Sequence, residues 1–443
     1  MSKPIEQQRF MCAIGAMQTV VAIPRAVPIL HSGPGCGPMV SGFFDKAKGY
    51  AGENTAPCTN FTEREVVFGG EDKLEELIRN TYKVLDTDLQ VVLTGCTSAI
   101  VGDDVERVVK TFAEEGKPIV TLETPGFKCS NFEAHDLVVN AVIDQYVDRR
   151  ARVTGKDARL VNLFATIPYQ DPFWKGNLEE LKRVLKGIGL RVNTLFGPYS
   201  RGVEEWKTIP AAGFNIVISP WYGLKIARRL EEKYDQPYYN FPYLPIGGNE
   251  TTRFLRGVER FAAAQGAELP EARVNAFIAR EELAFYEALD GLATFLLEFR
   301  YGLPEFVHVL HDANYVIGIA KFLLHETGIV PKEQFVTDNT PEEYHDRIRA
   351  EMKKISNKKD IPVFFEPDGG LAQRRIRDAG HEGRGLILGC GWDKRLARDK
   401  GYDFLSISPP SPYRLALTTC YAGYKGGLRL IEDIYDTVLA TYE

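Results

Sequence analysis

The sequence predicts an α/β fold made of three doubly wound, Rossmann-like domains, each with a parallel sheet. Short apolar runs that are typical of buried strands alternate with amphipathic segments that are typical of helices along nearly the whole chain. Such alternation predicts parallel strands joined by right-handed crossovers. The length of 443 residues exceeds the size at which one hydrophobic core usually stops growing, so we expect several domains.

The individual elements follow from these patterns. The expected strands cover residues 27–30, 90–93, 119–122, 160–164, 192–195, 215–218, 306–310, 334–336, 362–365, 386–388 and 404–407. Apolar side chains recur at helical spacing in residues 72–85 and 102–115. Thr340 to Glu343 match a capping box with proline at the first helical position, which predicts a helix that ends near residue 355.

Two features of the sequence suggest where the domains meet. A basic, polar stretch at residues 148–159 separates a first unit from a second, and a long helical region at about 250–299 precedes a third. We therefore expect domains at residues 1–150, 151–302 and 303–443, the last of which ends in a C-terminal helix.

Composition and charge exclude several classes of protein. Hydrophobic residues make up 44% of the chain and charged residues 26%, as in ordinary globular proteins. The net charge of −6 argues against nucleic acid as the main partner. No apolar run is long enough to span a membrane, and the polar start lacks the pattern of a signal peptide. We therefore expect a cytoplasmic protein that binds neither nucleic acid nor membrane.

The chain contains seven cysteines, most of them in its first third. They are Cys12, Cys36, Cys58, Cys96, Cys129, Cys390 and Cys420. A disulfide framework is not expected in a large chain without a secretion signal. Reduced thiols that pack as small apolar groups are the simplest expectation.

The positions of some cysteines nevertheless suggest a site. Cys36 and Cys96 each come directly after an expected strand, and the segment 124–130, which contains further Cys and Ser residues, follows the next strand. Ligands of parallel α/β sheets gather at the carboxyl ends of the strands, so these side chains should share one edge. Cys12 lies in an N-terminal segment that can fold over that edge. Glycines around Cys36 permit close backbone approach, and loop N–H groups there would stabilise negative charge.

Several interpretations of this edge remain open from the residues alone. A structural zinc site is not favoured, because the sequence has no Cys-x₂₋₄-Cys pair. A phosphate cradle is not favoured, because the glycine-rich loop lacks the Walker lysine and does not match G-x-G-x-x-G. Packed structural thiols are the favoured interpretation of position and residue type, and an anionic iron–sulfur cluster is the alternative.

The sequence also resembles the β-type subunit of component 1 proteins of the nitrogenase superfamily. Residues 12–16 resemble the C-x-x-G-A element of that family, and residues 31–36 resemble its H-G-x-x-G-C loop. The other matching segments are 61–70 (T/Q-E-x-x-x-V-F-G-G), 95–104 (C-x-x-x-I-x-G-D-D), 124–130, 244–247 and 421–427. Each element is short, and the resemblance rests on their combination and order along nearly the whole chain.

The resemblance implies a P-cluster-type [8Fe-7S] centre at the junction with a homologous α-type subunit, in an α2β2 complex. Carried over residue by residue, the metal ligands in this chain are Cys12, Cys36 and Cys96. Ser130 matches a serine that can join the cluster when the cluster is oxidised. The family's cluster takes six thiolates, so the remaining three would come from the partner subunit.

The resemblance further implies a role in electron relay. Electrons would pass from an ATP-dependent, homodimeric iron–sulfur reductase through this cluster to a catalytic cofactor in the α-type subunit. The stretch comparable to the family's cofactor site, residues 219–227, contains no cysteine, so no catalytic residue is expected in this chain. We expect His308, His311 and His325 to be ordinary core or surface histidines.

The other cysteines are expected to have different roles. Cys129 adjoins Ser130 and can lie near the cluster, whereas Cys58 is expected in the core or at the interface. Cys390 and Cys420 are expected to be packed thiols of the third domain.

Both the residues that match the family's motifs and the residues that depart from them suggest which branch of the superfamily the chain resembles. Three matching cysteines favour an eight-iron relay over the smaller clusters of assembly scaffolds and dark-operative protochlorophyllide reductases. Cys12 comes early, so the long N-terminal extension of molybdenum-type β subunits is not expected. The C-terminal third resembles vanadium- and iron-only-type β chains. However, Ser32 replaces a glycine of their first loop, and residues 37–39 lack its aromatic residue.

These departures favour a nitrogenase-like methylthio-alkane reductase, which cleaves C–S bonds reductively to release methanethiol and hydrocarbons. The alternatives are the β subunit of a vanadium- or iron-only-type nitrogenase, a cofactor-assembly scaffold subunit, and a metal-free binding protein that keeps the fold.

Overall fold

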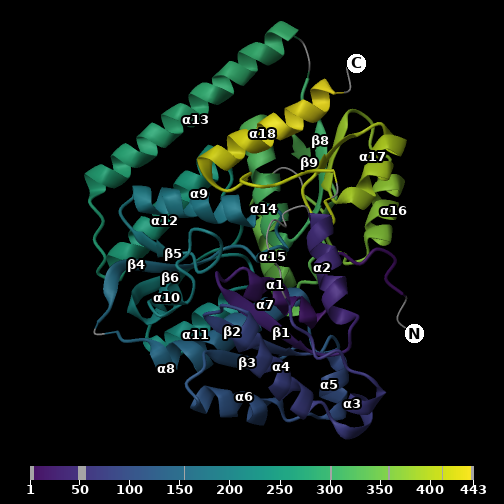
Figure 1. Ribbon diagram of the computed structural model, residues 1–443. Coiled ribbons are helices and arrows are strands. Elements are labelled where there is room, and N and C mark those ends of the chain that lie inside the picture. Colours follow the sequence, from purple (N-terminus) through teal and green to yellow (C-terminus); the bar gives the residue numbers. More distant parts are fainter. Residues whose placement is uncertain are drawn as a thin grey trace.

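The computed structural model describes residues 4–47, 56–153, 155–299, 302–357, 360–411 and 413–440. Its strands form three parallel sheets with helices on their faces (Figure 1). The first sheet has the order β1 (Ala26–His31), β2 (Leu89–Thr94), β3 (Ile119–Glu123). The second has the order β5 (Arg191–Asn193), β4 (Asp157–Phe164), β6 (Ala212–Ile218), β7 (Tyr238–Phe241). The expected α/β fold with several parallel-sheet units is therefore confirmed.

The third sheet has its first strand near the middle, as doubly wound sheets do. Its order is β11 (Val363–Phe365), β10 (Gln334–Val336), β8 (Phe306–His311), β12 (Gly385–Gly389), β13 (Asp403–Ser406), and β9 (Val330–Pro331) also pairs with β8. The chain thus winds outward from β8 in both directions. Each expected strand overlaps a strand of the structure, but β7 and β9 were not foreseen. The three sheets fall within the three expected segments, whose exact boundaries remain a prediction.

Helices cover both faces of the first sheet. On one face, Leu74 and Ile78 of α4 (Glu71–Val84) pack with Phe112 of α6 (Val105–Glu114) against the sheet. On the other face lie α1 (Ala16–Val21) and α7 (Asn131–Val142), whose apolar residues join the large core that continues into the other sheets. The two helices expected in this region are therefore confirmed as α4 and α6.

The expected capping box at Thr340 is not formed. The Thr340 hydroxyl bonds to the carboxylate of Asp338, and Pro341 instead precedes a 3₁₀ turn, η5 (Glu342–Tyr344). The α-helix begins only after this turn, as α15 (His345–Lys353). The local hydrogen bond to Asp338, two residues earlier, holds the Thr340 side chain away from a capping position.

Long helices complete the molecule. The expected helical region near residues 250–299 consists of α12 (Gly247–Ala264) and α13 (Glu271–Phe299), and α13 runs along one side of Figure 1. The C-terminal helix α18 (Gly423–Leu439) returns from the third unit to pack on α12, α13 and α9 (Trp174–Gly187). Among the described residues, no helix combines the length and the apolar character that crossing a membrane requires.

Candidate functional site

Two cysteines lie at the carboxyl edge of the first sheet, where its strands lead into helices. β1 leads through a glycine-rich loop to Cys36, the first residue of α2 (Cys36–Ala47). The neighbouring strand β2 leads through Gly95 to Cys96, the first residue of α5 (Cys96–Val101). The two cysteines therefore follow neighbouring parallel strands, as the sequence predicts.

Cys12 reaches this edge from the N-terminal segment. Its backbone forms an antiparallel bridge with Ser130, which follows β3. The N–H of Met11 donates to the side chain of Asn131 at 2.8 Å, and the Asn131 N–H donates to the Met11 carbonyl at 3.0 Å. Ser130 caps the N-terminus of α7, where its hydroxyl accepts a hydrogen bond from the N–H of Glu133. The N-terminal segment thus folds over the sheet edge and brings Cys12 beside Ser130.

Gly126 lies between the sulfurs of Cys12 and Cys96. A Cβ atom at Gly126 would lie 3.3 Å from the Sγ of Cys12 and 3.4 Å from the Sγ of Cys96. It would also lie only 2.9 Å from the Cβ of Cys12. The N–H of Gly126 donates a hydrogen bond to the Sγ of Cys96 at 3.1 Å. The two sulfurs therefore face the same small space, which glycine keeps open.

Cys36 belongs to the same group, and we call Cys12, Cys36 and Cys96 the sulfur edge. Cys36 follows β1, which pairs with the strand β2 that leads to Cys96. Burial raises the pKa of the Cys12 thiol, and negative charge on Cys96 and Cys36 raises that pKa further. The hydroxyl of Ser32 donates a hydrogen bond to the Sγ of Cys36 at 3.2 Å. All three cysteines are free thiols and only partly buried, so a second chain can reach them.

Four helix N-termini surround the sulfur edge. Helices α2 and α5 begin with Cys36 and Cys96, Cys12 precedes the 3₁₀ turn η1 (Ala13–Gly15), and Ser130 precedes α7. The first N–H groups of a helix carry partial positive charge and favour an anion. Thiolate ligands with such N–H groups around them fit an anionic iron–sulfur cluster. They do not fit calcium or magnesium, which prefer oxygen ligands.

Two further cysteines flank the sulfur edge. The Sγ of Cys58 lies 3.5 Å from the carbonyl oxygen of Ser32, and burial together with negative charge on Cys36 raises the pKa of Cys58. Burial and nearby negative charge, including that of Cys12, raise the pKa of Cys129 to about 11. Cys129 directly precedes Ser130, whose backbone bridges to Cys12, and half-buried Cys58 lies beside the loop that leads to Cys36.

Three of the motifs that suggested the resemblance meet beneath the sulfur edge. The Nε2 of His31 lies 2.9 Å from the carboxylate of Asp103, and the N–H of Gly70 donates to the same carboxylate at 2.9 Å. A Cβ atom on Gly70 would lie 2.5 Å from the ring of Phe61, which packs edge-on against His31. Burial lowers the pKa of His31, and the charge of Asp103 partly opposes this effect. These residues tie together the loops that position the cysteines.

The third unit fixes the segment that carries Cys12. Arg9, three residues earlier, forms a buried ion pair with Asp393 at 2.9 Å. The Nη1 of Arg9 also donates to the Sγ of Cys390 at 2.7 Å, and a Cβ atom on Gly369 would lie 2.3 Å from Arg9 Nη2. Sequence reasoning missed this contact because its partners are 384 residues apart.

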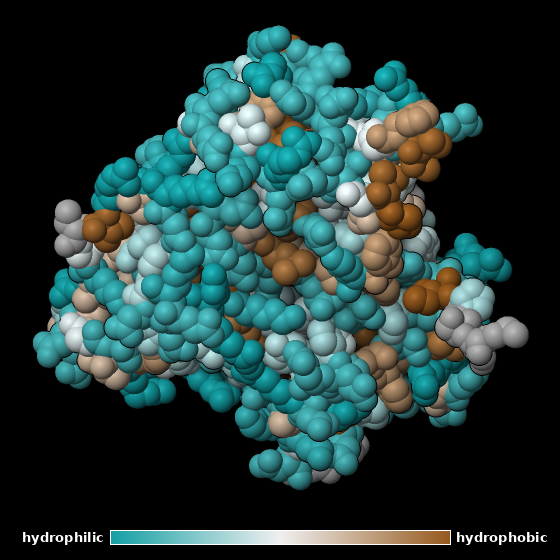
Figure 2. Space-filling model, turned by 90° about the horizontal axis from the view of Figure 1, so that it is seen from below, coloured by the Kyte–Doolittle hydropathy of each residue, from teal (hydrophilic) through white to brown (hydrophobic). Residues whose placement is uncertain are grey.

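An apolar surface lies next to the sulfur edge. Val67 and Phe68 at the end of α3 (Glu63–Phe68), and Ile100 in α5, are exposed, Phe68 to 82%. Figure 2 shows the underside of the molecule, where hydrophobic side chains gather on the side that holds α2, α3 and α5 in Figure 1. Contiguous apolar surface of this kind is typical of interaction sites.

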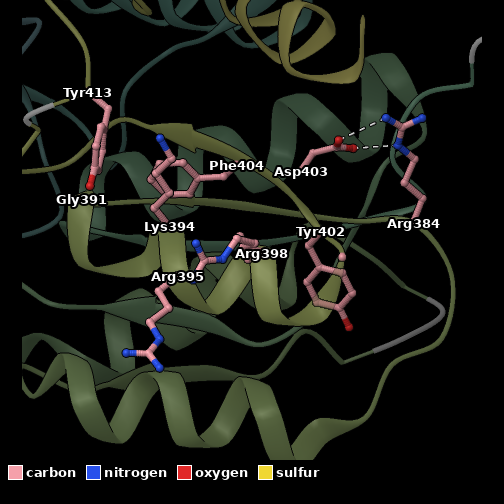
Figure 3. Close-up of a pocket in the computed structure, with 11 residues that line it drawn as sticks. Arg384, Gly391, Lys394, Arg395, Arg398, Tyr402, Asp403, Phe404 and Tyr413 are labelled. Carbon is pink, nitrogen blue, oxygen red and sulfur yellow. Dashed lines mark hydrogen bonds and ion pairs between the residues drawn. The ribbon is translucent and has the colours of Figure 1, made fainter. Parts of the chain in front are cut away.

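A separate hollow of about 870 Å³ lies in the third unit, around α17 (Lys394–Lys400) (Figure 3). Its basic lining residues include Lys394, Arg395 and Arg398. Arg384, at its rim, is bound by the carboxylate of Asp403 at 2.7 Å. No cysteine lines this hollow, so we place the candidate site at the sulfur edge, whose side chains carry metal-binding chemistry.

Comparisons with known proteins identify the family of the chain. A family model described as "Nitrogenase component 1 type Oxidoreductase" matches residues 12–439. The nitrogenase molybdenum-iron protein beta chain of Methanococcus maripaludis is 24% identical over 97% of this chain and 93% of its own length. The nitrogenase vanadium-iron protein beta chain of Trichormus variabilis is also 24% identical, over 97% of this chain and 92% of its own length.

A solved structure titled "Nitrogenase Cp1 at pH 6.5" has the same fold. It matches with a TM-score of 0.80 over 100% of this chain and 95% of its own, at 20% identity. One subunit of the light-independent protochlorophyllide reductase of Nostoc punctiforme is 26% identical, but over only 58% of this chain and 51% of its own length. The chain therefore belongs to the nitrogenase component 1 type oxidoreductase family, as a β-type chain.

Proposed function

We propose that this protein is the electron-relay β-type subunit of a nitrogenase-like reductase. In this proposal Cys12, Cys36 and Cys96 hold half of a P-cluster-type [8Fe-7S] centre, and Ser130 is the hydroxyl that joins the centre on oxidation. The observation that carries it is the convergence of three partly exposed thiols at one sheet edge, beside four helix N-termini. That arrangement concentrates soft ligands where negative charge is favoured.

The geometry of the sulfur edge supports a shared centre. Three thiolates are fewer than an eight-iron cluster requires, and all three cysteines are only partly buried. A homologous α-type subunit that offers three more thiolates would close the site and cover it from water. We therefore propose an α2β2 complex in which the centre itself helps to hold the two kinds of subunit together.

When bound, such a centre accepts and releases single electrons. The chain's own part is to hold and tune it. The Gly126 N–H donates to the sulfur of Cys96 at 3.1 Å, and the Ser32 hydroxyl donates to that of Cys36 at 3.2 Å. Hydrogen bonds to ligand sulfurs help to set the reduction potential of a cluster. The catalytic cofactor is placed in the α-type partner.

The apolar surface supports a second, transient partner. Ile100 lies exposed in the helix that Cys96 begins, and Val67 and Phe68 lie exposed in the neighbouring helix α3. Docking there would bring an electron donor close to the sulfur edge, and we propose that the donor is an ATP-dependent, homodimeric iron–sulfur reductase. A Phe68→Ser variant should slow electron delivery to the complex while leaving its iron content unchanged.

The proposed reaction is reductive cleavage of a C–S bond in small methylthio-alkanes. Two electrons and two protons convert the thioether into methanethiol and a hydrocarbon. The sequence feature that favours this branch is Ser32, which stands where β chains of alternative nitrogenases have glycine. A Cβ atom on Gly95 would lie 2.1 Å from the Ser32 hydroxyl oxygen, so Gly95 makes room for this serine.

Substrate assays on the purified complex test this reaction. Supplied with reductase, ATP and an electron source, the complex should release methanethiol from dimethyl sulfide and form little ammonia from dinitrogen. Ammonia as the main product would favour the β subunit of a vanadium- or iron-only-type nitrogenase.

Iron content tests the relay role separately. About eight irons at the interface per αβ pair are expected for a relay, whereas about four with no turnover of either substrate would favour an assembly scaffold. A colourless, iron-free complex would favour a binding protein that keeps only the fold.

A further inference from the structure

A second group of metal-binding side chains lies in the third sheet, far from the sulfur edge. It consists of His308, Glu333 and His381, each of which offers one ligand atom, and these atoms all lie within 4.8 Å of one another. His308 is in β8, Glu333 directly precedes β10, and His381 lies between α16 (Gly369–Ala379) and β12. In Figure 1, β8 and β9 lie in the upper part of the molecule and the first sheet in the lower part.

The Glu333 carboxylate lies between the two imidazole rings. Its two oxygens lie 2.8 and 3.1 Å from the Nε2 of His381, and one of them lies 3.4 Å from the Nδ1 of His308. That Nδ1 also lies 3.1 Å from the backbone carbonyl of Glu333. Nδ1 is therefore the ring nitrogen of His308 that faces Glu333, and an ion bound by both residues would replace the proton on Nδ1.

The hydrogen-bonding capacity of His308 is also incompletely satisfied. The side chain of His308 is 0% exposed, and its Nε2 has no hydrogen-bond partner among the described residues. Buried polar atoms without a partner are rare in native proteins and are often explained by a bound ion or water.

The surroundings hold the three side chains in place. Phe306 packs edge-on against His308 at 5.7 Å, and the hydroxyl of Tyr402 donates to the carbonyl of His381 at 2.9 Å. The Lys332 N–H donates to the carbonyl of Val307 at 3.0 Å, which fixes the turn that carries Glu333. Glu333 and His381 remain 18% and 22% exposed, so an ion can enter and a water can complete its coordination.

We propose that His308, Glu333 and His381 form a site for a divalent transition metal, and that the ion is Zn²⁺. Two imidazoles and one carboxylate with an open fourth position suit zinc, whereas calcium and magnesium prefer sites made of oxygen ligands. The ion joins β8 to the turn before β10 and to the loop before β12. The site does not depend on the proposed relay function.

Zinc analysis of the complete complex tests the site. The purified complex is treated briefly with a mild chelator, incubated with one equivalent of Zn²⁺ per β-type chain, and freed of unbound metal by gel filtration. Zinc and iron are then counted by elemental mass spectrometry. The wild type should retain close to one zinc per β-type chain. Glu333→Gln and His381→Gln should each retain less than about a tenth of that amount, because a three-ligand site loses a ligand.

The matched control is His325→Gln. His325 is an exposed histidine of the same unit whose Nε2 bonds only to the carbonyl of Ile355 among the described residues, at 2.8 Å. This variant should retain wild-type zinc. Unchanged iron content in each variant shows that the complex remains folded, and if one site variant fails to assemble, the other decides. A wild type that retains no zinc overturns the proposal, as does equal zinc in wild type and both site variants.

Discussion

Cys390 and the three cysteines of the sulfur edge have thiol groups in opposite surroundings. Cys390 is fully buried, accepts a hydrogen bond from Arg9 at 2.7 Å, and burial raises its pKa far above the usual range. The cysteines of the sulfur edge are partly exposed, lie at one sheet edge and begin or precede helices. A fully buried thiol with a committed donor is inert, whereas a metal can reach partly exposed thiols beside positive helix ends.

The largest effect is expected from removing a sulfur-edge thiol. Cys36→Ala or Cys96→Ala should abolish the interface cluster, because each removes a proposed ligand, and should weaken pairing with the α-type subunit. Cys390→Ala is the control and should leave iron per αβ pair unchanged. Iron analysis and gel filtration under anaerobic conditions measure both effects. Equal iron in the Cys36 and Cys390 variants would show that the sulfur edge is not the ligand set.

The next largest effect is expected from replacing Arg9, which donates a hydrogen bond to Cys390. Arg9→Met should lower the free energy of unfolding by about 3–5 kcal/mol, because it leaves Asp393 buried without its counter-charge. It should also lower cluster occupancy, since Arg9 anchors the segment that carries Cys12. Urea denaturation and iron analysis measure the two effects. The exposed Arg25, paired with Asp86 and Asp88, supplies the control Arg25→Met, which should change neither quantity.

A third prediction concerns α7, which begins after Ser130 and supports the sulfur edge. Burial raises the pKa of Asp136, whose carboxylate accepts the Gly223 N–H at 2.9 Å, from 3.8 to about 7. The folded chain therefore keeps this carboxyl protonated, while the unfolded chain loses the proton near pH 4. The resulting contribution to stability is complete below about pH 4 and is lost as the pH rises through about 7.

Over this range the free energy of unfolding of the wild type should fall by roughly 4 kcal/mol through this one group. Asp136→Asn, which cannot ionise, should lack that part of the fall. Denaturation curves at several pH values for both proteins measure this part of the fall. The contributions of all other titrating groups cancel when the free energies of unfolding of the two proteins are subtracted. Parallel pH profiles would contradict the raised pKa.

The smallest effect is expected from crowding the sulfurs. Gly126→Ala places a methyl group within 3.4 Å of two sulfur atoms and should destabilise the edge by about 1–3 kcal/mol. The cluster should then be held less firmly and lose iron faster to a chelator. Gly35→Ala, in the loop before Cys36, meets no atom within 4 Å and is the control. Equal rates of iron loss in the two variants would mean that the space beside Gly126 is not the binding space.

More of the fold than of the contacts between distant segments could be predicted from the sequence. Strand β10 was predicted over residues 334–336, which are its observed bounds, because apolar runs between turns mark buried strands. Strand β7, in contrast, is largely half-buried and contains Asn240, so its pattern resembled a loop. Strand β9 has only two residues, too few for any periodicity.

The candidate sites show the same limit. Cys36 and Cys96 were predicted to share an edge because each follows a strand, which is local information. The ion pair of Arg9 with Asp393 joins residues from the first and third units, and no local pattern marks it. His308 was expected to be an ordinary histidine, because Glu333 and His381 come from two other loops and meet it only in the folded sheet.

The anchoring of Arg9 on Asp393 also determines when the segment that carries Cys12 can be held fully in place. During synthesis Arg9 leaves the ribosome 384 residues before Asp393 does. Until Asp393 has emerged and folded, the segment that carries Cys12 has its contacts with Ser130 and Asn131 but lacks the buried counter-charge of Arg9. The segment that carries the third thiol therefore gains its full anchoring only after the third unit has been made.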